Sequence, residues 1–341
     1  ATNFKEVCLG YDDAQAKEEA SRCLNCKNPR CVVGCPVSIQ INEFIHEINE
    51  GNIEKAADVI ARSSALPAVC GRVCPQETQC EGVCVRGIKG EPVAIGKLER
   101  YVADWAREHG YVAAKPGEPN GRKVAVIGAG PAGIAASFFL ARAGAEVHVY
   151  EENERAGGVV SYIIPSFRID EKEIQKDVGL AKACGAVFHF GQRIEDVGAL
   201  REKEGFDAVI LAIGAHREMP LPLEKGEAEN ALHFLRRFKE EEGRIRIGKN
   251  VVIVGAGNTA MDTARAAIRC EGVEKVFLVY RRTKRYMPAD QEELEEAIED
   301  GVLFRELLSP FTLENGVLRC HKTVLSEMEA GGRRSVRETG E

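Results

Sequence analysis

The feature that most constrains this chain is the segment Val124–Gly133, in which a short run of mostly β-branched apolar residues stops at a glycine. An Ala- and Phe-rich stretch follows, so the pattern predicts a buried parallel strand, a tight turn and a helix. Its three glycines would permit the turn, let the backbone approach a pyrophosphate, and let helix and strand pack closely, while the first helical amides bind phosphate. The predicted dinucleotide-binding residues here are Gly128, Gly130, Pro131, Ala132 and Gly133.

We call a glycine turn of this kind, together with the start of the helix after it, a cradle. An acidic residue lies at the position where a dinucleotide-binding cradle requires one. The next strand pattern, 146–150, ends directly before Glu151. Glu151 follows the first glycine by about 20 positions, the spacing typical of the acid that binds a ribose hydroxyl. A glycine turn in an unrelated α/β unit is the alternative that this motif leaves open.

The amino-acid composition limits which classes of protein this chain can belong to. A chain of 341 residues, 44% hydrophobic and 29% charged, is long enough for two or three globular domains. Its net charge of −7 argues against nucleic acid or an anionic membrane as a partner. No apolar run approaches the ~18 residues of a membrane span, and residues 1–10 lack the form of a signal peptide. We therefore expect a cytoplasmic protein.

Eight of the twelve cysteines lie between Cys23 and Cys84. Disulfides are not expected beside cytosolic nucleotide machinery, where closely spaced cysteines indicate metal or redox chemistry. Two four-cysteine zinc sites and plain buried thiols remain as alternatives, although zinc ribbons show no bias towards a following proline. The two groups are Cys23, Cys26, Cys31 and Cys35, before Pro36, and Cys70, Cys74, Cys80 and Cys84, with Pro75 after the second.

The first group resembles the cysteine run of bacterial ferredoxins, in which the cysteine before proline ligates the other of two clusters. That rule puts Cys23, Cys26 and Cys31 on one iron–sulfur cluster. It sends Cys35 to a second cluster, shared with the later cysteines. Cluster chemistry fits the predicted cradle, because a flavin can exchange single electrons with clusters.

Helical spacing surrounds the cysteines. Asp12 or Asp13 is expected to cap a helix through Ser21, and Asn52 to cap another. An apolar face at 41–48 and a stripe at 95–105, within a helix of about 94–108, are predicted to be core. We predict a helical iron–sulfur domain over 1–114 and, from its Pro and Gly content, a linker over 115–121.

The region after Glu151 continues an α/β pattern. The glycine-led loop 156–168, with Gly158, either lies against an isoalloxazine ring or forms a buried crossover. A helix is predicted over 171–183, a strand over 187–190, and a buried strand over 207–215 that presents Gly214 to a nucleotide. We assign 122–225 to an incomplete FAD-binding Rossmann-like domain.

The cradle pattern then repeats at 251–260. The next strand ends in two arginines rather than an acid, and guanidinium groups pair with a 2′-phosphate, which favours NADPH over NADH. A solvated basic strand end is the alternative reading. We assign 226–341 to an NAD(P)H-binding Rossmann-like domain, with the candidate residues Gly255, Gly257, Asn258, Thr259, Ala260, Arg281 and Arg282.

Together these residues resemble the flavin- and cluster-containing family of the NADPH-dependent glutamate synthase small subunit, over essentially the whole chain. That family also includes the N-terminal half of dihydropyrimidine dehydrogenase, the large subunit of a bifurcating ferredoxin:NADP oxidoreductase, and selenate reductase subunits. The stretches that carry the resemblance are 22–27, 34–37, 70–75, 80–84, 95–99, 128–133, 255–260, 280–282 and 287–289.

The resemblance implies FAD, NADPH and two [4Fe–4S] clusters. It implies a helical double-cluster domain followed by the FAD and NADPH domains. It assigns Cys23, Cys26, Cys31 and Cys84 to one cluster, and Cys35, Cys74, Cys80 and Glu99 to the other. Cys70 then remains a free thiol. Two departures are a glycine position occupied by Ile163 and the absence of the strand and Gly-Asp motif that return the family's chain to the FAD domain.

By resemblance, the expected function is an electron-input module that takes a hydride from NADPH and delivers single electrons to a partner subunit or domain. No acid–base residue is assigned, because the cofactors supply the redox chemistry. Alternatives are a ferredoxin-linked bifurcating or sulfide-type enzyme, a pyrimidine- or selenate-type subunit, and a noncatalytic cluster-bearing assembly piece.

Overall fold

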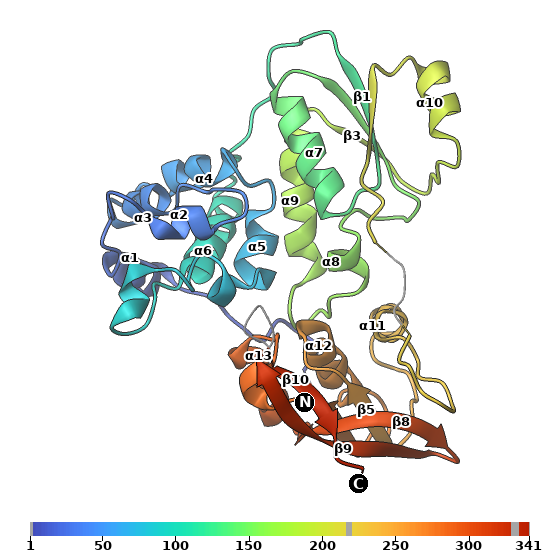
Figure 1. The fold of residues 1–341 in the computed structure, drawn as a ribbon. Coiled ribbons are helices and arrows are strands. Elements are labelled where there is room, and N and C mark those ends of the chain that lie inside the picture. Colours follow the sequence, from blue (N-terminus) through green and yellow to red (C-terminus); the bar gives the residue numbers. More distant parts are fainter. Residues whose placement is uncertain (1–2, 216–219, 329–333, 341) are drawn as a thin grey trace. The chain divides into compact units, whose positions relative to one another are not determined.

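A computed structural model describes residues 3–215, 220–328 and 334–340 of the chain (Figure 1). These residues form two compact units. The first holds Lys5–Ser161 with Ser166–Ala215, and the second holds the other described residues. Within the described ranges, no helix has the length and apolar character needed to cross a membrane.

The cysteine-rich part of the first unit is helical. Asp12 caps the first helix as predicted, because its Oδ1 accepts a hydrogen bond from the Gln15 amide at 2.8 Å. Asn52 occupies the N-cap position of α4, but the capping prediction is wrong, since its side chain bonds to Glu47 instead. The predicted helix over 94–108 is confirmed. The elements are α1 (Asp13–Ser21), α2 (Arg30–Gly34), α3 (Ile41–Asn49), α4 (Ile53–Ala61), α5 (Pro67–Val73), η1 (Gln76–Thr78), η2 (Val85–Ile88) and α6 (Ile95–Glu108).

Amphipathic spacing builds the core of this helical part. The apolar face predicted at 41–48 lies on α3 and is buried against α4 and α1, and α6 packs on α4 in the same core. The stripe on α6 is buried except at Trp105, which is half-buried and stacks on His109 with ring centroids 4.0 Å apart. The core residues on these two helices are Ile41, Phe44, Ile45 and Ile48, and Ile95, Leu98 and Val102.

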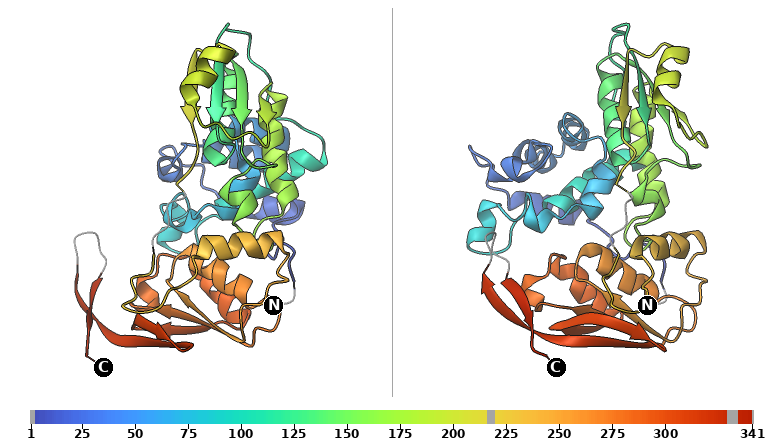
Figure 2. Two further views of the ribbon diagram at one scale, coloured as in Figure 1. Left: turned by 90° about the vertical axis from the view of Figure 1, so that its right-hand side faces the viewer. Right: turned by 45° about the vertical axis from the view of Figure 1, so that its right-hand side comes forward.

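The α/β part of the first unit has a four-stranded parallel sheet in the order β3-β2-β1-β4. Helices α7 and α9 cover one face and α10 lies on the other (Figures 1 and 2), as right-handed crossovers require when the strand order reverses. The elements are β1 (Lys123–Ile127), α7 (Pro131–Arg142), β2 (Glu146–Tyr150), α8 (Val159–Tyr162), α9 (Glu171–Ala183), β3 (Val187–His189), α10 (Val197–Glu204) and β4 (Ala208–Leu211).

One strand differs from its prediction. The stretch 207–215 was expected to be a buried strand, but β4 is the edge of the sheet, and its Leu211 is 62% exposed. An apolar run indicates a strand but not its place in the sheet, which depends on long-range pairing.

Helix α9 joins the two parts of this unit. Buried Asp177 accepts hydrogen bonds from the amides of Ala68 and Val69, at 3.3 and 2.9 Å, at the start of α5. Nearby, buried Arg72 on α5 pairs with Asp104 of α6 at 2.8 Å. These bonds fix the cysteine-bearing helices against the nucleotide-binding sheet.

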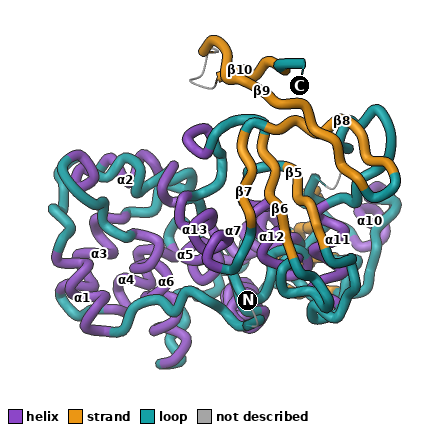
Figure 3. The backbone as a smooth tube through the Cα atoms, turned by 90° about the horizontal axis from the view of Figure 1, so that it is seen from below, coloured by secondary structure: helices purple, strands orange, loops and turns teal. Residues whose placement is uncertain are grey.

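The second unit contains a three-stranded parallel sheet, β5-β6-β7, and a three-stranded antiparallel sheet, β10-β9-β8 (Figure 3). Buried Arg265 of α12 and Arg269, just after it, both donate to Asp300, which follows α13, at 2.9 and 2.7 Å. The elements are α11 (Ala231–Glu240), β5 (Asn250–Val254), α12 (Asn258–Ala267), β6 (Lys275–Tyr280), η3 (Lys284–Tyr286), α13 (Gln291–Glu299), β7 (Leu303–Glu306), β8 (Leu308–Glu314), β9 (Val317–Met328) and β10 (Arg334–Glu338).

Candidate cofactor sites

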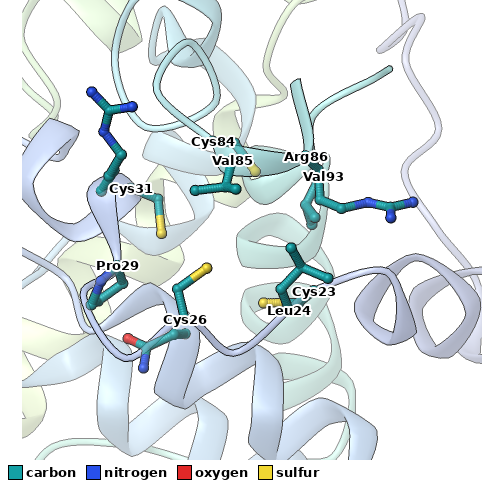
Figure 4. A pocket seen from close by; sticks show the side chains of 11 residues that line it. Cys23, Leu24, Cys26, Pro29, Cys31, Cys84, Val85, Arg86 and Val93 are labelled. Carbon is teal, nitrogen blue, oxygen red and sulfur yellow. The ribbon is translucent and has the colours of Figure 1, made fainter. Parts of the chain in front are cut away.

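The fold brings one group of four cysteines around a common hollow. Three come from the segment between α1 and the start of α2, and the fourth comes from the position just before η2. Figure 4 shows their sulfur atoms bordering one space. The cysteines that line it, called here the first set, are Cys23, Cys26, Cys31 and Cys84. This is the group that the family resemblance assigns to one cluster.

Thiols of the first set affect one another. Burial raises the pKa of Cys31 to about 11, with further contributions from Cys84 and Cys23. Burial also raises the pKa of Cys23, with help from Cys26 and Cys84. A cationic iron centre would have the opposite effect and lower these pKa values, because it stabilises the thiolate form. In the described part of the chain, no three Cys, His, Asp or Glu side chains are close enough to hold a single metal ion.

A second set centres on the buried carboxyl of Glu99. Its Oε1 has no hydrogen-bond partner among the described residues, although the side chain points into the protein interior. Burial raises the pKa of Glu99 well above its ordinary range, and the charges of Cys74 and Asp177 raise it further. A buried, unpaired carboxyl is costly unless a ligand satisfies it, so its presence fits an iron ligand.

Cysteines surround that carboxyl. Burial raises the pKa of Cys80, and Glu81, Glu99 and Cys35 act in the same direction. A hydrogen bond with Cys70 lowers the pKa of Cys74, against the effect of burial. The structure therefore brings Cys74 and Cys80 within electrostatic range of Glu99, with Cys35 close to Cys80. Cys70, left out of both sets by the resemblance, adjoins Cys74. The hydrogen bond with Cys74 and burial raise the pKa of Cys70, and the charge of Glu99 raises it further, so Cys70 also lies within electrostatic range of that carboxyl.

Sequence reasoning missed what fixes the helix that carries Glu99. The Glu81 carboxylate accepts a hydrogen bond from the Gly96 amide at 2.9 Å, and Glu19 accepts one from Ala94 at 2.8 Å. Both carboxylates therefore sit at the N-terminus of α6, where the helix dipole favours negative charge. Since Glu81 lies between Cys80 and Cys84, this bond ties the cysteine loop to the Glu99 helix. The acidic residue Glu81 inside a cysteine motif was the feature of the sequence that could have indicated this bond.

The first cradle has the backbone that the glycine motif predicts. Gly128 has a φ of +99°, and a Cβ there would lie 2.4 Å from the carbonyl oxygen of Ala212. A Cβ on Gly133 would lie 1.9 Å from the carbonyl oxygen of Gly128. Gly130 is the N-cap of α7, and Pro131 and Ala132 are its first residues. The cradle therefore leaves no room for a side chain at Gly128 or Gly133.

Glu151 fastens this cradle. Its Oε2 accepts a hydrogen bond from the Ala129 amide at 2.7 Å, and its Oε1 accepts one from the Asn153 amide at 2.9 Å. The carboxylate is buried at the end of β2. It therefore lies beside the glycine turn, where the spacing placed a ribose ligand.

Two further candidates border the same turn. A Cβ on Gly158 would lie 2.8 Å from the Cα of Gly130, and the Gly157 amide donates to the carbonyl of Ala129 at 2.7 Å. Gly214 has a φ of +76° shortly after β4, where Leu211 and Ile213 are exposed. Close backbone and exposed apolar side chains at strand ends fit a flavin nucleotide.

The second cradle has the same order of elements. Gly255 has a φ of +135° after β5, and Gly257 is the N-cap of α12, which begins Asn258, Thr259, Ala260. Asn258 exchanges hydrogen bonds with Asp290, whose amide donates to the Asn258 Oδ1 at 3.1 Å. Sequence reasoning gave no role to Asp290, although it directly follows the family stretch 287–289.

The two arginines after β6 are not equivalent. Arg281 is exposed, whereas Arg282 is half-buried and its Nε donates to the Arg334 carbonyl at 2.7 Å. Because that bond engages Arg282, Arg281 is the freer of the two for a phosphate. The sequence predicted the same role for both.

Comparisons with known proteins agree with this arrangement. Residues 1–111 match the family model "Dihydroprymidine dehydrogenase domain II, 4Fe-4S cluster". Residues 122–305 match the model "Pyridine nucleotide-disulphide oxidoreductase". Fold and site together define an NAD(P)-dependent flavin and iron–sulfur oxidoreductase, with FAD, NADPH and 4Fe-4S centres as its cofactors.

Curated relatives show which family the chain belongs to within this class of oxidoreductases. The chain is 35% identical to the glutamate synthase [NADPH] small chain of Escherichia coli (strain K12), over 97% of this chain and 74% of that one. It is 36% identical to the Azospirillum brasilense small chain, over 89% and 66%. It is also 36% identical to the NADPH-Fe(3+) oxidoreductase subunit beta of Geobacter sulfurreducens, over 97% of this chain and 51% of that one. The chain belongs to the family of the glutamate synthase small chain.

Solved structures agree at the level of the fold. A 2-naphthoyl-CoA reductase aligns with a TM-score of 0.52 at 16% identity, over 89% of this chain and 42% of its own. Histamine dehydrogenase from Rhizobium sp. 4-9 aligns with a TM-score of 0.50 at 18% identity, over the same shares. The chain spans less than half of each, and at these identities the likeness shows the fold alone.

Proposed function

We propose that this chain is an NADPH-oxidising electron-input module that supplies single electrons to a redox partner, most like the glutamate synthase small chain. The observation that carries the proposal is that the first cysteine set, the orphaned Glu99 carboxyl and the first cradle lie in one compact unit. When bound, FAD accepts a hydride from NADPH and releases its two electrons one at a time to the clusters.

The chain's own residues bind and orient these groups. The first cradle and Glu151 would hold FAD, with α7 amides on its pyrophosphate. The second cradle and Arg281 would hold NADPH, since a guanidinium pairs with a 2′-phosphate. Its glycine turn is fastened by the Asn258–Asp290 pair. We retain 1–114, 122–225 and 226–341 as the proposed domains, joined by the linker 115–121.

Two [4Fe–4S] clusters are proposed, one on each set. The first takes Cys23, Cys26, Cys31 and Cys84; the second takes Cys35, Cys74, Cys80 and Glu99. Glu99 supports the second set because no other group in the described residues satisfies its buried Oε1. An oxygen ligand alters the net charge of a cluster and hence its potential, so the two clusters would differ in potential.

The test is an anaerobic spectrum of purified protein, with iron, sulfide and flavin counted per chain, followed by titration with NADPH. We expect flavin and about eight irons, as two four-iron clusters require, and bleaching of both bands by NADPH. Zinc in place of iron, or bands that NADPH leaves unchanged, would refute the proposal.

Variants of Glu99 separate ligation from folding. Glu99→Leu should retain about four of eight irons, while the metal-free variant gains stability because a buried, unpaired carboxyl group is gone. Glu99→Gln keeps an oxygen donor and should retain both clusters with a shifted potential. A Leu variant that keeps all its iron would remove Glu99 from the ligand set.

A further inference from the structure

The edge of the first cysteine set differs in charge from the rest of the chain. Two segments, 24–37 and 82–90, surround these cysteines and contain no Asp or Glu, although the chain has a net charge of −7. They carry four exposed cations, Lys27, Arg30, Arg86 and Lys89. Arg30 and Arg86 line the hollow itself, and Figure 4 shows Arg86 extending away from the sulfurs. We call this surface the basic rim.

These four cations have no partners within the described chain. None of their side-chain nitrogens makes an ion pair or hydrogen bond there, whereas several exposed arginines elsewhere are paired. Arg193 pairs with Glu152 at 2.5 Å, and Arg246 pairs with Glu271 at 3.0 Å. Unpaired cations of one sign create a local positive potential that persists despite the negative net charge.

Apolar side chains are exposed among the cations. Val33 is 88% exposed, and a Cβ on Gly34 would touch Val83, so the two segments adjoin at this point. Leu24 also lines the hollow. Apolar groups ringed by charges are typical of a protein-docking surface. The exposed apolar residues of the rim are Leu24, Val33, Val37, Val83 and Ile88.

We propose that the basic rim docks a small acidic one-electron carrier protein, which collects electrons at the first cysteine set. The inference rests on the proposed function and adds the exit surface and the chemistry of the acceptor. Each carrier accepts one electron, and no bond or proton is exchanged at the rim. A contact limited to these two short segments suits a transient redox encounter, which buries less than about 1,200 Å².

The test uses the full chain with both cofactor types and two probes of opposite charge, an acidic [2Fe–2S] ferredoxin and a basic c-type cytochrome. Binding is measured by surface plasmon resonance at low and high ionic strength. The variant is Lys27→Glu/Lys89→Glu, and the matched control is Arg193→Glu/Lys203→Glu, which changes exposed cations away from the cysteines by the same charge. Iron per chain is counted in each protein.

We expect the rim variant to weaken ferredoxin binding about tenfold at low salt, and the control to change it about twofold or less. Salt should weaken the wild-type complex, and the cytochrome should bind poorly. Equal losses in both variants, or equal affinity for both probes, would overturn the proposal. A complex that persists in high salt would also overturn it and identify a permanent subunit interface.

The experiment distinguishes failure of the proposed function from failure of the docking proposal. If NADPH fails to reduce the cofactors in the absence of any carrier, the electron-input function fails whatever the binding results. If NADPH reduces them and the rim variant binds ferredoxin like the wild type with full iron content, only the docking proposal fails.

Discussion

The two glycine cradles follow one sequence pattern but differ in how tightly their turns are packed. In the first, a Cβ at the last glycine, Gly133, would lie 1.9 Å from a backbone oxygen. In the second, Ala260 takes the corresponding position, so a methyl group is already accommodated there. The middle glycines do not differ in this way, because a Cβ on Gly130 or on Gly257 would meet nothing closer than 3.8 or 3.9 Å. A later loop holds both turns, since the Gly157 amide donates to the Ala129 carbonyl at 2.7 Å and the Ala289 amide donates to the Ala256 carbonyl at 3.1 Å. The difference therefore lies at the last position of the motif.

Two acids, Asp177 of the first unit and Asp300 of the second, also differ in the direction of their pKa shifts. Burial raises the pKa of Asp177, beside the first cradle's helices, to about 7. Burial also acts to raise the pKa of Asp300, but hydrogen bonds from Arg269 and Arg265 outweigh it and lower that pKa below its usual value. A shared motif therefore does not imply a shared stability or a shared response to pH.

The largest expected difference between the cradles comes from one methyl group. Gly133→Ala should destabilise the first unit by about 3 kcal/mol and abolish flavin binding, because backbone oxygen cannot move aside. Ala260→Gly, at the corresponding position of the second cradle, should change stability by about 1 kcal/mol or less. Urea unfolding and flavin content measure both effects. Similar losses in the two variants would contradict the difference in packing.

The pH response should distinguish the buried acids. Because the folded-state pKa of Asp177 exceeds its unfolded value, its contribution to stability is full below about pH 4 and is lost as pH rises to about 7. Asp177→Asn removes this titration, so its stability relative to the wild type should rise with pH between about 4 and 7, against a constant loss of about 1–2 kcal/mol because one of the two backbone amides loses its acceptor. Asp300→Asn should lose stability at neutral pH, and less in acid. Unfolding midpoints across this range provide the measurement.

Glu151 offers a subtler test of the first cradle. Glu151→Gln keeps one acceptor oxygen but cannot accept from both Ala129 and Asn153, so we expect a loss of about 1–2 kcal/mol in stability. Flavin affinity, measured by fluorescence titration, should fall about tenfold. The affinity for NADPH should not change; if it fell in parallel, Glu151 would be acting on both cradles.

The smallest expected effect lies in the second cradle. Arg281→Ala should weaken NADPH binding about tenfold and leave NADH binding unchanged, since only NADPH has the 2′-phosphate. Arg282→Ala is the matched control, because its Nε already binds the Arg334 carbonyl. The measurement is the dissociation constant of each nucleotide for the wild type and both variants. Equal weakening of NADH would remove the phosphate role.

Local patterns predicted most of the elements. The α1 cap at Asp12, the α3 face and the bounds of α9 depend on residues within a few turns of one another, so spacing alone found them. The edge position of β4 and the partner of Asn52 depend on long-range pairing, which one sequence does not contain. Those were the predictions that the structure corrected.

The candidate sites needed more than spacing. Cys84 is remote in sequence from Cys31, and only the resemblance placed them together before the fold did. Glu99 lies on a helix with a core-facing stripe, where a carboxyl gives no local signal of ligation. The unequal roles of Arg281 and Arg282 arise from a strand that begins at Arg334, so no nearby residue predicts them.

The bond from the Gly96 amide to Glu81 has a consequence for assembly. Glu81 separates Cys80 of the second set from Cys84 of the first, and it also anchors the helix that bears Glu99. Ordering this short loop for either of the two proposed clusters would therefore order it for the other, and the conformational entropy would be lost only once. Iron loading should accordingly be cooperative, so that chains holding one cluster are scarce at every stage of reconstitution.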